Sequence, residues 1–77
     1  MQLNTLNKVQ KELETSNKAY GQFTSYAEGI AVLREEYLEL EQEIFKKPSK
    51  RDKKRIHDEA IQVAAMALKI IEYTGDR

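Results

Sequence analysis

Apolar residues recur along the middle of the chain at alternating spacings of four and three. Between residues 26 and 47 the recurring apolar positions are Tyr26, Ile30, Leu33, Tyr37, Leu40 and Ile44. Side chains at this spacing share one face of an α-helix. Ser25 followed three residues later by Glu28 is typical of a helix start. The pattern therefore predicts a helix over residues 26–47 that ends before Pro48, because proline pushes the preceding residue out of helical geometry.

The C-terminal segment is apolar on more than one side. Two adjacent helical stripes run along it, one of Ile56, Ala60, Val63, Ala67 and Ile70, the other of Ile61, Ala64, Leu68 and Ile71. Ser49 is the expected N-cap, with Asp52 in the first turn, and Gly75 is the expected terminator. These signals predict a helix over residues 49–73, buried on several sides and open to close helix approach at its alanines.

The N-terminal segment has the thinnest apolar pattern. Leu3, Leu6, Val9 and Leu13 predict a helix over residues 3–16, and Tyr20 followed by Gly21 predicts a loop. Because the rest of this helix is polar, it is expected either to form a mobile arm or to pack on a partner subunit. The sequence leaves open whether it docks on its own chain or on a neighbour.

The three segments predict a single all-α domain over residues 1–77, a three-helix chain with a long helical hairpin. A chain of 77 residues buries only a modest core. One hairpin cannot cover this much apolar surface. We therefore expect a homo-oligomer, at least a dimer, whose two hairpins complete a four-helix-bundle-like core.

Composition narrows the chemistry. The chain has no cysteine, which excludes disulfides and thiolate metal sites, and His57 is its only histidine, which argues against zinc. Net charge is zero, although residues 28–43 hold six glutamates and residues 46–55 hold seven basic residues. Nucleic-acid-binding domains are more often basic overall, so nucleic acid is not the expected partner. Neither a membrane-spanning run nor a signal peptide is apparent, and we expect a cytoplasmic protein without a membrane partner.

Acidic residues flank the apolar stripes of the two longer helices. Glu36 and Glu39 lie one turn apart on the first, and Glu59 and Gln62 are similarly spaced on the second. If the two helices pack together, the three glutamates can form a cluster of hard oxygen ligands, which is what Mg²⁺ requires. Acidic helical surfaces are also common without a metal, so spacing alone leaves both interpretations open.

The longer phrases around these acids add a resemblance. Residues 28–73, including Glu28-Gly29-Ile30-Ala31-Val32-Leu33 and the stretch from Ala60 to Leu68, resemble the MazG-like all-α nucleotide pyrophosphohydrolases, especially short phage and prophage members. That family carries a Glu-x-x-Glu motif on one helix and a Glu-x-x-Asp motif on the next. Here Gln62 stands where the family has the aspartate.

The resemblance implies a helical dimer and Mg²⁺-dependent cleavage of a nucleoside triphosphate to a monophosphate and pyrophosphate. It implies that Glu36, Glu39, Glu59 and Gln62 hold the Mg²⁺ and that Glu35 is a candidate water-activating acid. An amide oxygen can coordinate Mg²⁺, but it carries no full charge and cannot act as a base. Basic residues near the second motif are candidate phosphate contacts, namely Lys50, Lys54 and His57.

Two other interpretations remain. A non-catalytic helical module would keep the fold and bind a nucleotide or a protein, for example as a phage regulator or inhibitor of a host system. A small nucleic-acid binder would use the basic connection instead. Four aromatic residues also have two possible roles, namely Tyr20, Phe23, Tyr26 and Tyr37. Each can stack on a base, or pack in a core or dimer interface.

Overall fold

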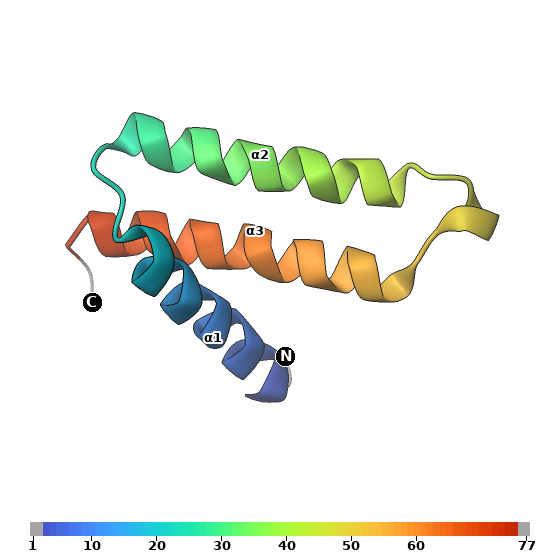
Figure 1. Ribbon diagram of the computed structural model, residues 1–77, viewed down its shortest axis with the longest axis horizontal. Helices are drawn as coiled ribbons and strands as arrows, with labels where there is room; N and C mark the ends of the chain where they lie inside the picture. Colours follow the sequence, from blue (N-terminus) through green and yellow to red (C-terminus); the bar gives the residue numbers. More distant parts are fainter. Residues whose placement is uncertain (1–2, 76–77) are drawn as a thin grey trace.

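The computed structural model describes residues 3–75 as an all-helical chain. Its elements are α1 (Leu3–Tyr20), α2 (Tyr26–Ile44), the single 3-10 turn η1 (Pro48–Lys50) and α3 (Lys53–Tyr73). α2 and α3 run antiparallel as a long hairpin, and α1 crosses α3 obliquely (Figure 1). No strand occurs within the described residues. The predicted all-α class and the helical hairpin are therefore confirmed.

Two predicted helix ends shift by a turn. α1 continues to Tyr20 rather than stopping at residue 16, and Gly21 ends it with a positive φ of 74°, a conformation that glycine adopts without steric cost. α2 ends at Ile44, three residues before the predicted end. The capping signal at its start is confirmed: the Glu28 backbone N–H donates to Ser25 Oγ, while the Glu28 side chain accepts from the Thr24 backbone N–H.

The prediction that Ser49 caps the third helix is wrong. Ser49 lies inside η1, and the N-cap is Asp52, whose carboxylate accepts from the backbone N–H groups of Lys54 and Arg55. The Asp52 carboxylate was predicted to lie in the first turn of this helix, where it would interact favourably with the helix dipole alone. At the cap it also satisfies two backbone donors that have no partner inside the helix. The connection between α2 and α3 is correspondingly longer.

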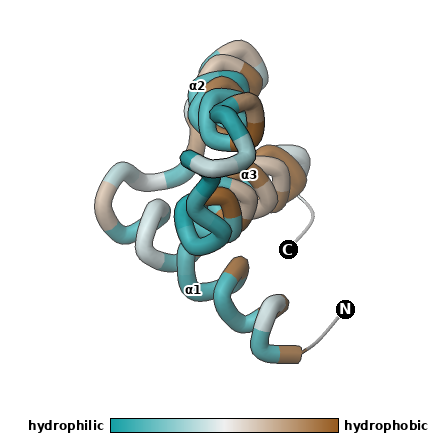
Figure 2. Tube along the Cα trace, turned by 90° about the vertical axis from the view of Figure 1, so that its right-hand side faces the viewer, coloured by the Kyte–Doolittle hydropathy of each residue, from teal (hydrophilic) through white to brown (hydrophobic). Residues whose placement is uncertain are grey.

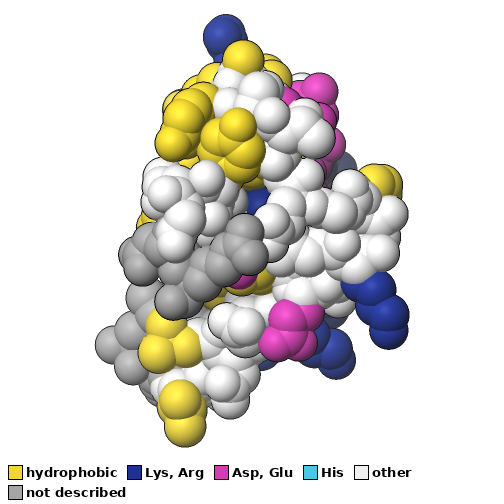
Figure 3. All heavy atoms as spheres, turned by 90° about the vertical axis from the view of Figure 1, so that its left-hand side faces the viewer, with side chains coloured by type: hydrophobic (Ala, Val, Ile, Leu, Met, Phe, Trp, Pro, Cys, Tyr) yellow, Lys and Arg dark blue, Asp and Glu magenta, His cyan; other side chains and the backbone are white. Residues whose placement is uncertain are grey.

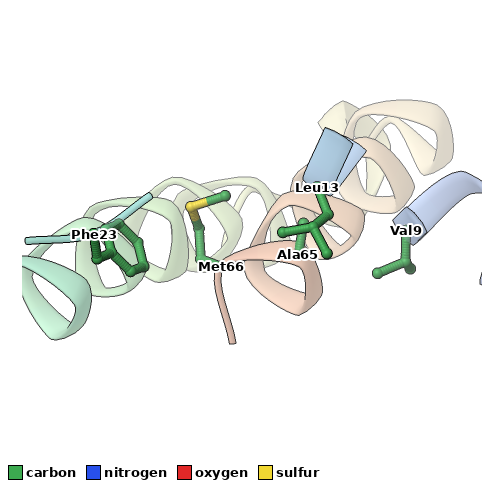
Figure 4. Packing of buried hydrophobic residues seen from close by; sticks show 5 residues of the cluster. All are labelled: Val9, Leu13, Phe23, Ala65 and Met66. Atoms are coloured by element: carbon green, nitrogen blue, oxygen red, sulfur yellow. The ribbon is translucent and has the colours of Figure 1, made fainter. Parts of the chain in front are cut away.

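The core is small and lies between α3 and both of its neighbours. Its buried residues come from α1, from the connection before α2 and from α3, and they form one row (Figure 4): Val9, Leu13, Phe23, Ala65 and Met66. Among the described residues, no large side chain is fully buried. The chain alone therefore covers only part of its apolar surface.

α1 docks on α3 of its own chain. Val9 and Leu13 bury the thin stripe of this helix, while Leu3 and Leu6 stay exposed. Two polar contacts join the same helices, from Asn17 Nδ2 to Glu72 Oε1 at 3.1 Å and from Lys69 Nζ to Ser16 Oγ at 2.8 Å. α1 makes no close backbone contact with α2. Within one chain, α1 is thus a docked helix rather than a free arm.

The apolar stripe of α2 does not face α3 squarely. Gly29 of α2 is buried against Ile70 and Phe23. A Cβ added to it would lie 3.0 Å from Ile70 Cγ1 and 3.1 Å from a Phe23 ring carbon. By contrast Tyr26 and Ile30 are about 60% exposed. Hydrophobic positions of α2 and α3 lie along one side of the hairpin, on the right in Figure 2. Hydrophobic side chains also gather over the start of α2 (Figure 3). Four of the six residues in the predicted core stripe are therefore exposed, namely Tyr26, Ile30, Tyr37 and Ile44.

None of the helices within residues 3–75 is long and apolar enough to cross a membrane.

Candidate functional site

The hairpin brings three glutamates from two helices together. Glu36 and Glu39 are one turn apart on α2, so they project from neighbouring positions of one face. Glu59 comes from the first half of α3, which runs back along α2. One carboxylate oxygen from each residue lies within 4.8 Å of the other two. These three residues, called the carboxylate cluster below, were predicted to meet, and the structure brings them together.

Two oxygens of the carboxylate cluster are buried without a partner. Glu36 Oε2 and Glu59 Oε2 are buried, and with all three carboxylates ionised no hydrogen-bond donor in residues 3–75 reaches them. A buried carboxylate oxygen without a donor costs free energy, so such atoms are rare unless a missing ligand completes them. A proton shared with Glu39, which is within hydrogen-bonding reach of both Glu36 and Glu59, is one way to satisfy these oxygens, and a divalent cation is another. All the donors are hard oxygens, which suits Mg²⁺ or Mn²⁺ rather than a soft metal.

Burial and mutual repulsion make the cluster hold protons. Desolvation, then the neighbouring charges of Glu39 and Glu59, raises the pKa of Glu36 to about 7. Desolvation, then Glu39, also raises the pKa of Glu59. Both effects disfavour the charged carboxylate. A bound divalent cation reverses them, because it stabilises the charged form of every ligand it touches.

Cations of the basic segment pair with the end of α2. Lys46 Nζ lies 3.0 Å from Glu43 Oε1, and Arg55 Nε lies 3.8 Å from Glu43 Oε2. Arg51 donates to the backbone carbonyl of Ile44 at 2.8 Å. Part of the basic run therefore secures the connection between the two helices. These pairings leave the carboxylate cluster itself without a direct cation partner among the described ion pairs.

The remaining metal-ligand candidate, Gln62, lines a pocket of about 550 Å³ together with Glu36. Glu12 of α1 lines the same pocket, and its charge contributes to the raised pKa of Glu36. Sequence reasoning missed Glu12, because it lies on a different helix with no motif around it. Its only sequence signal is its position one residue before Leu13, at the border of the buried stripe.

The other predicted site residues lie outside the cluster. Glu35 is exposed on α2, and Lys50 is exposed in η1. Lys54 Nζ pairs with Asp58 at 2.8 Å, which raises the pKa of Lys54 and lowers that of Asp58. His57 Nδ1 lies 3.1 Å from Asp58 Oδ1. Lys54 and His57 line a second pocket that also reaches Gln62.

The four candidate aromatics have different surroundings. Phe23 is buried in the core, which confirms its packing role. Tyr26 packs edge-to-face on Tyr73, with ring centroids 4.7 Å apart. Tyr37 is about half exposed on α2, and Tyr20 is 86% exposed at the rim of the pocket beside Glu36. Tyr20 and Phe23 both line that pocket, and Tyr20 is the exposed one of the two.

Comparisons with protein-family models, with curated proteins and with solved structures gave no match for this chain.

Proposed function

We propose that this chain is a Mg²⁺-dependent nucleoside triphosphate pyrophosphohydrolase of the MazG-like type, or a weakly active relative. The observation that carries the proposal is the carboxylate cluster, with two buried oxygens that no donor in residues 3–75 satisfies. The resemblance of residues 28–73 to that family supports it independently, since the family places ligands at the positions of Glu36, Glu39 and Glu59.

In this scheme Glu36, Glu39 and Glu59 hold the cation. When bound, Mg²⁺ neutralises phosphate charge and makes water more acidic. A water molecule attacks the α-phosphorus, the bond to the oxygen bridging to the β-phosphorus breaks, and pyrophosphate leaves. Because Glu35 lies outside the cluster, Glu12 replaces it as the candidate acceptor of the water proton. Positioning and charge neutralisation provide most of the acceleration.

We also propose that two copies pair through the open side of the hairpin. This surface, called the outer face below, combines exposed residues of α2, namely Tyr26, Ile30, Tyr37 and Ile44, with Ala60, Ala64, Ala67 and Ile71 of α3. The alanines permit close approach of helix backbones. The small core of the single chain leaves this apolar surface to be covered by an identical one, as in a four-helix bundle.

Turnover of a nucleotide panel tests the catalytic proposal. Pyrophosphate release is measured with each common ribo- and deoxyribonucleoside triphosphate, with and without Mg²⁺. We expect Mg²⁺-dependent release with at least one nucleotide, and its loss in Glu36→Gln. Glu35→Gln is the matched control, since it neutralises the adjacent but exposed carboxylate and should keep activity.

Silence with every nucleotide, unaffected by either variant, would contradict catalysis. The neutral Gln62 gives a specific reason to consider that outcome, because three carboxylates hold Mg²⁺ more weakly than four. The second candidate function is then a non-catalytic module that binds a nucleotide or a protein. Calorimetry with the same nucleotides separates nucleotide binding from no binding.

A further inference from the structure

Lys69 is the one charged residue that is buried in the described part of the chain. Its exposed fraction is 3%, although lysine is among the residues least often buried. It lies in the second half of α3, where α1, α3 and the connection before α2 meet. A buried ammonium is costly unless something compensates for its lost hydration. Its surroundings therefore indicate what the charge is for.

Lys69 is held in one position by two neighbours. Its Nζ donates to Ser16 Oγ at 2.8 Å, and it lies 4.8 Å from the centre of the Phe23 ring. Phe23 itself is buried, so the ring presents a fixed face to the ammonium. Burial lowers the pKa of Lys69, while the charges of Glu28 and Glu72 oppose that effect. The ammonium is thus held in one position.

Lys69 and Ser16 also line the pocket of about 550 Å³ that reaches Glu36. The pocket therefore has a fixed cation in one wall and a residue of the carboxylate cluster in another. Such a volume suits a small-molecule ligand. The exposed ring of Tyr20 stands at its rim.

The balance of charge restricts the ligand. Glu12, Glu28 and Glu36 line the pocket beside the single lysine, so a free anion would meet net repulsion. A phosphate chain that carries its own divalent cation avoids this repulsion, because the cation neutralises the charge of the carboxylates that it contacts. The ligand class that satisfies both walls is a metal-complexed di- or triphosphate.

We infer that Lys69 binds a phosphate oxygen of such a ligand within this pocket, while the carboxylate cluster holds the ligand's metal ion. This inference rests on the proposed function for the identity of the metal site and adds the residue that anchors the phosphate chain. Ser16 positions the ammonium. No signal in the sequence marked Lys69, because it follows Leu68 inside an apolar run and belongs to neither acidic motif.

Lys69→Met separates phosphate binding from a purely structural role. Methionine keeps most of the aliphatic length and removes the charge, and replacing a buried charge with a packed apolar side chain is often neutral or stabilising. Lys18→Met is the matched control, since Lys18 is exposed at the end of α1. The probe is inorganic triphosphate with Mg²⁺, measured by calorimetry on the intact protein, with Mg²⁺ alone titrated in parallel.

We expect Lys69→Met to fold, to bind Mg²⁺ alone as the wild type does, and to bind Mg²⁺–triphosphate about tenfold or more weakly. Lys69→Arg should recover part of that loss. Lys18→Met should change neither affinity. If Lys69→Met does not fold, the triphosphate affinities of Lys69→Arg and Ser16→Ala are compared with that of the wild type. Both of these variants keep a positive charge at position 69.

Equal triphosphate affinity in the wild type and the Lys69 variants would overturn this inference while leaving the metal site intact. Wild type that binds neither Mg²⁺ nor Mg²⁺–triphosphate would overturn the proposed function as well. Triphosphate binding that persists without Mg²⁺ would overturn the requirement for a metal-complexed ligand. The three results are distinguishable in one set of titrations.

Discussion

Glu36 on α2 and Glu59 on α3 face each other with one buried oxygen apiece that no donor in the described chain satisfies. Two carboxylates at such a separation repel when both are charged, and burial strengthens the repulsion. The helical hairpin therefore holds together a pair that opposes its own packing when no cation is present.

Glu36→Gln should stabilise the protein in the absence of metal. The amide removes one charge and supplies an N–H donor to the neighbouring carboxylates. We expect the free energy of unfolding at pH 8 to rise by about 1 kcal/mol, measured by urea denaturation. Glu35→Gln, on the exposed side of the same turn, should change it by less than about 0.5 kcal/mol. A loss of stability in Glu36→Gln would contradict the repulsive cluster.

The stability of the metal-free protein should depend on pH through Glu36. Its pKa is raised from 4.5 to about 7, so the folded state keeps the proton over a range where the unfolded state has released it. The stability difference between wild type and Glu36→Gln should therefore be small below pH 4.5 and grow, at the expense of the wild type, as pH rises to about 7. Above pH 7 it should level off.

Mg²⁺ binding should also depend on pH, because the ion binds the charged carboxylates and must displace the proton held by Glu36. Calorimetric affinity for Mg²⁺ should increase with pH up to about 7 and then become constant. A pH-independent affinity between pH 5 and pH 7 would show that Glu36 is not a ligand.

Gln62→Asp should strengthen Mg²⁺ binding. The substitution restores a carboxylate at the position where the resembled family has one, in the pocket that Glu36 also lines. We expect the dissociation constant for Mg²⁺ to fall by about tenfold, read by calorimetry at pH 8. Gln42→Asp is the control, because Gln42 is exposed on α2. Equal affinities for both variants and wild type would sink the proposed ligand geometry at Gln62.

Ile30→Asp should separate the proposed dimer. Ile30 is a 59% exposed residue of the outer face, so a charge there costs little in one chain and much in an apolar interface. Sedimentation should show a dimeric wild type and a monomeric variant. Gln42→Asp introduces the same charge at an exposed residue of α2 outside the outer face, and should remain dimeric. A monomeric wild type would refute the pairing.

Gly29→Ala should destabilise the fold even though alanine is the better helix former. The added methyl would lie 3.0 Å from Ile70 Cγ1 and 3.1 Å from the buried Phe23 ring. The helix propensity gained is about 1 kcal/mol, and overpacking costs about 1–3 kcal/mol. We expect a net loss of about 1 kcal/mol, measured by urea denaturation. A net gain would mean that the Phe23 ring can move aside.

Helix existence followed from local pattern, and helix ends did not. The apolar periods and the Ser25–Glu28 cap identified all three helices correctly, because both signals act between residues a turn or two apart. Two candidate caps compete before α3, Ser49 and Asp52. Ser49 comes first after Pro48 and was therefore predicted as the cap. In the structure Ser49 lies in the 3-10 turn that begins at Pro48, and Asp52 caps α3 instead.

The sequence by itself determined that the chain is helical, that it forms a hairpin and that Glu36 and Glu39 share a helix face, since all of these depend on periodicity. Only the tertiary structure decided which face of α2 meets α3. Small Gly29 allows close contact on one side of the predicted stripe, which brings Glu36 inward to Glu59 and leaves Ile30 outside. Docking of α1 on α3 then places Glu12 in the pocket beside Glu36 and covers Lys69. Sequence periodicity does not show such contacts, because residues from different helices meet only through tertiary packing.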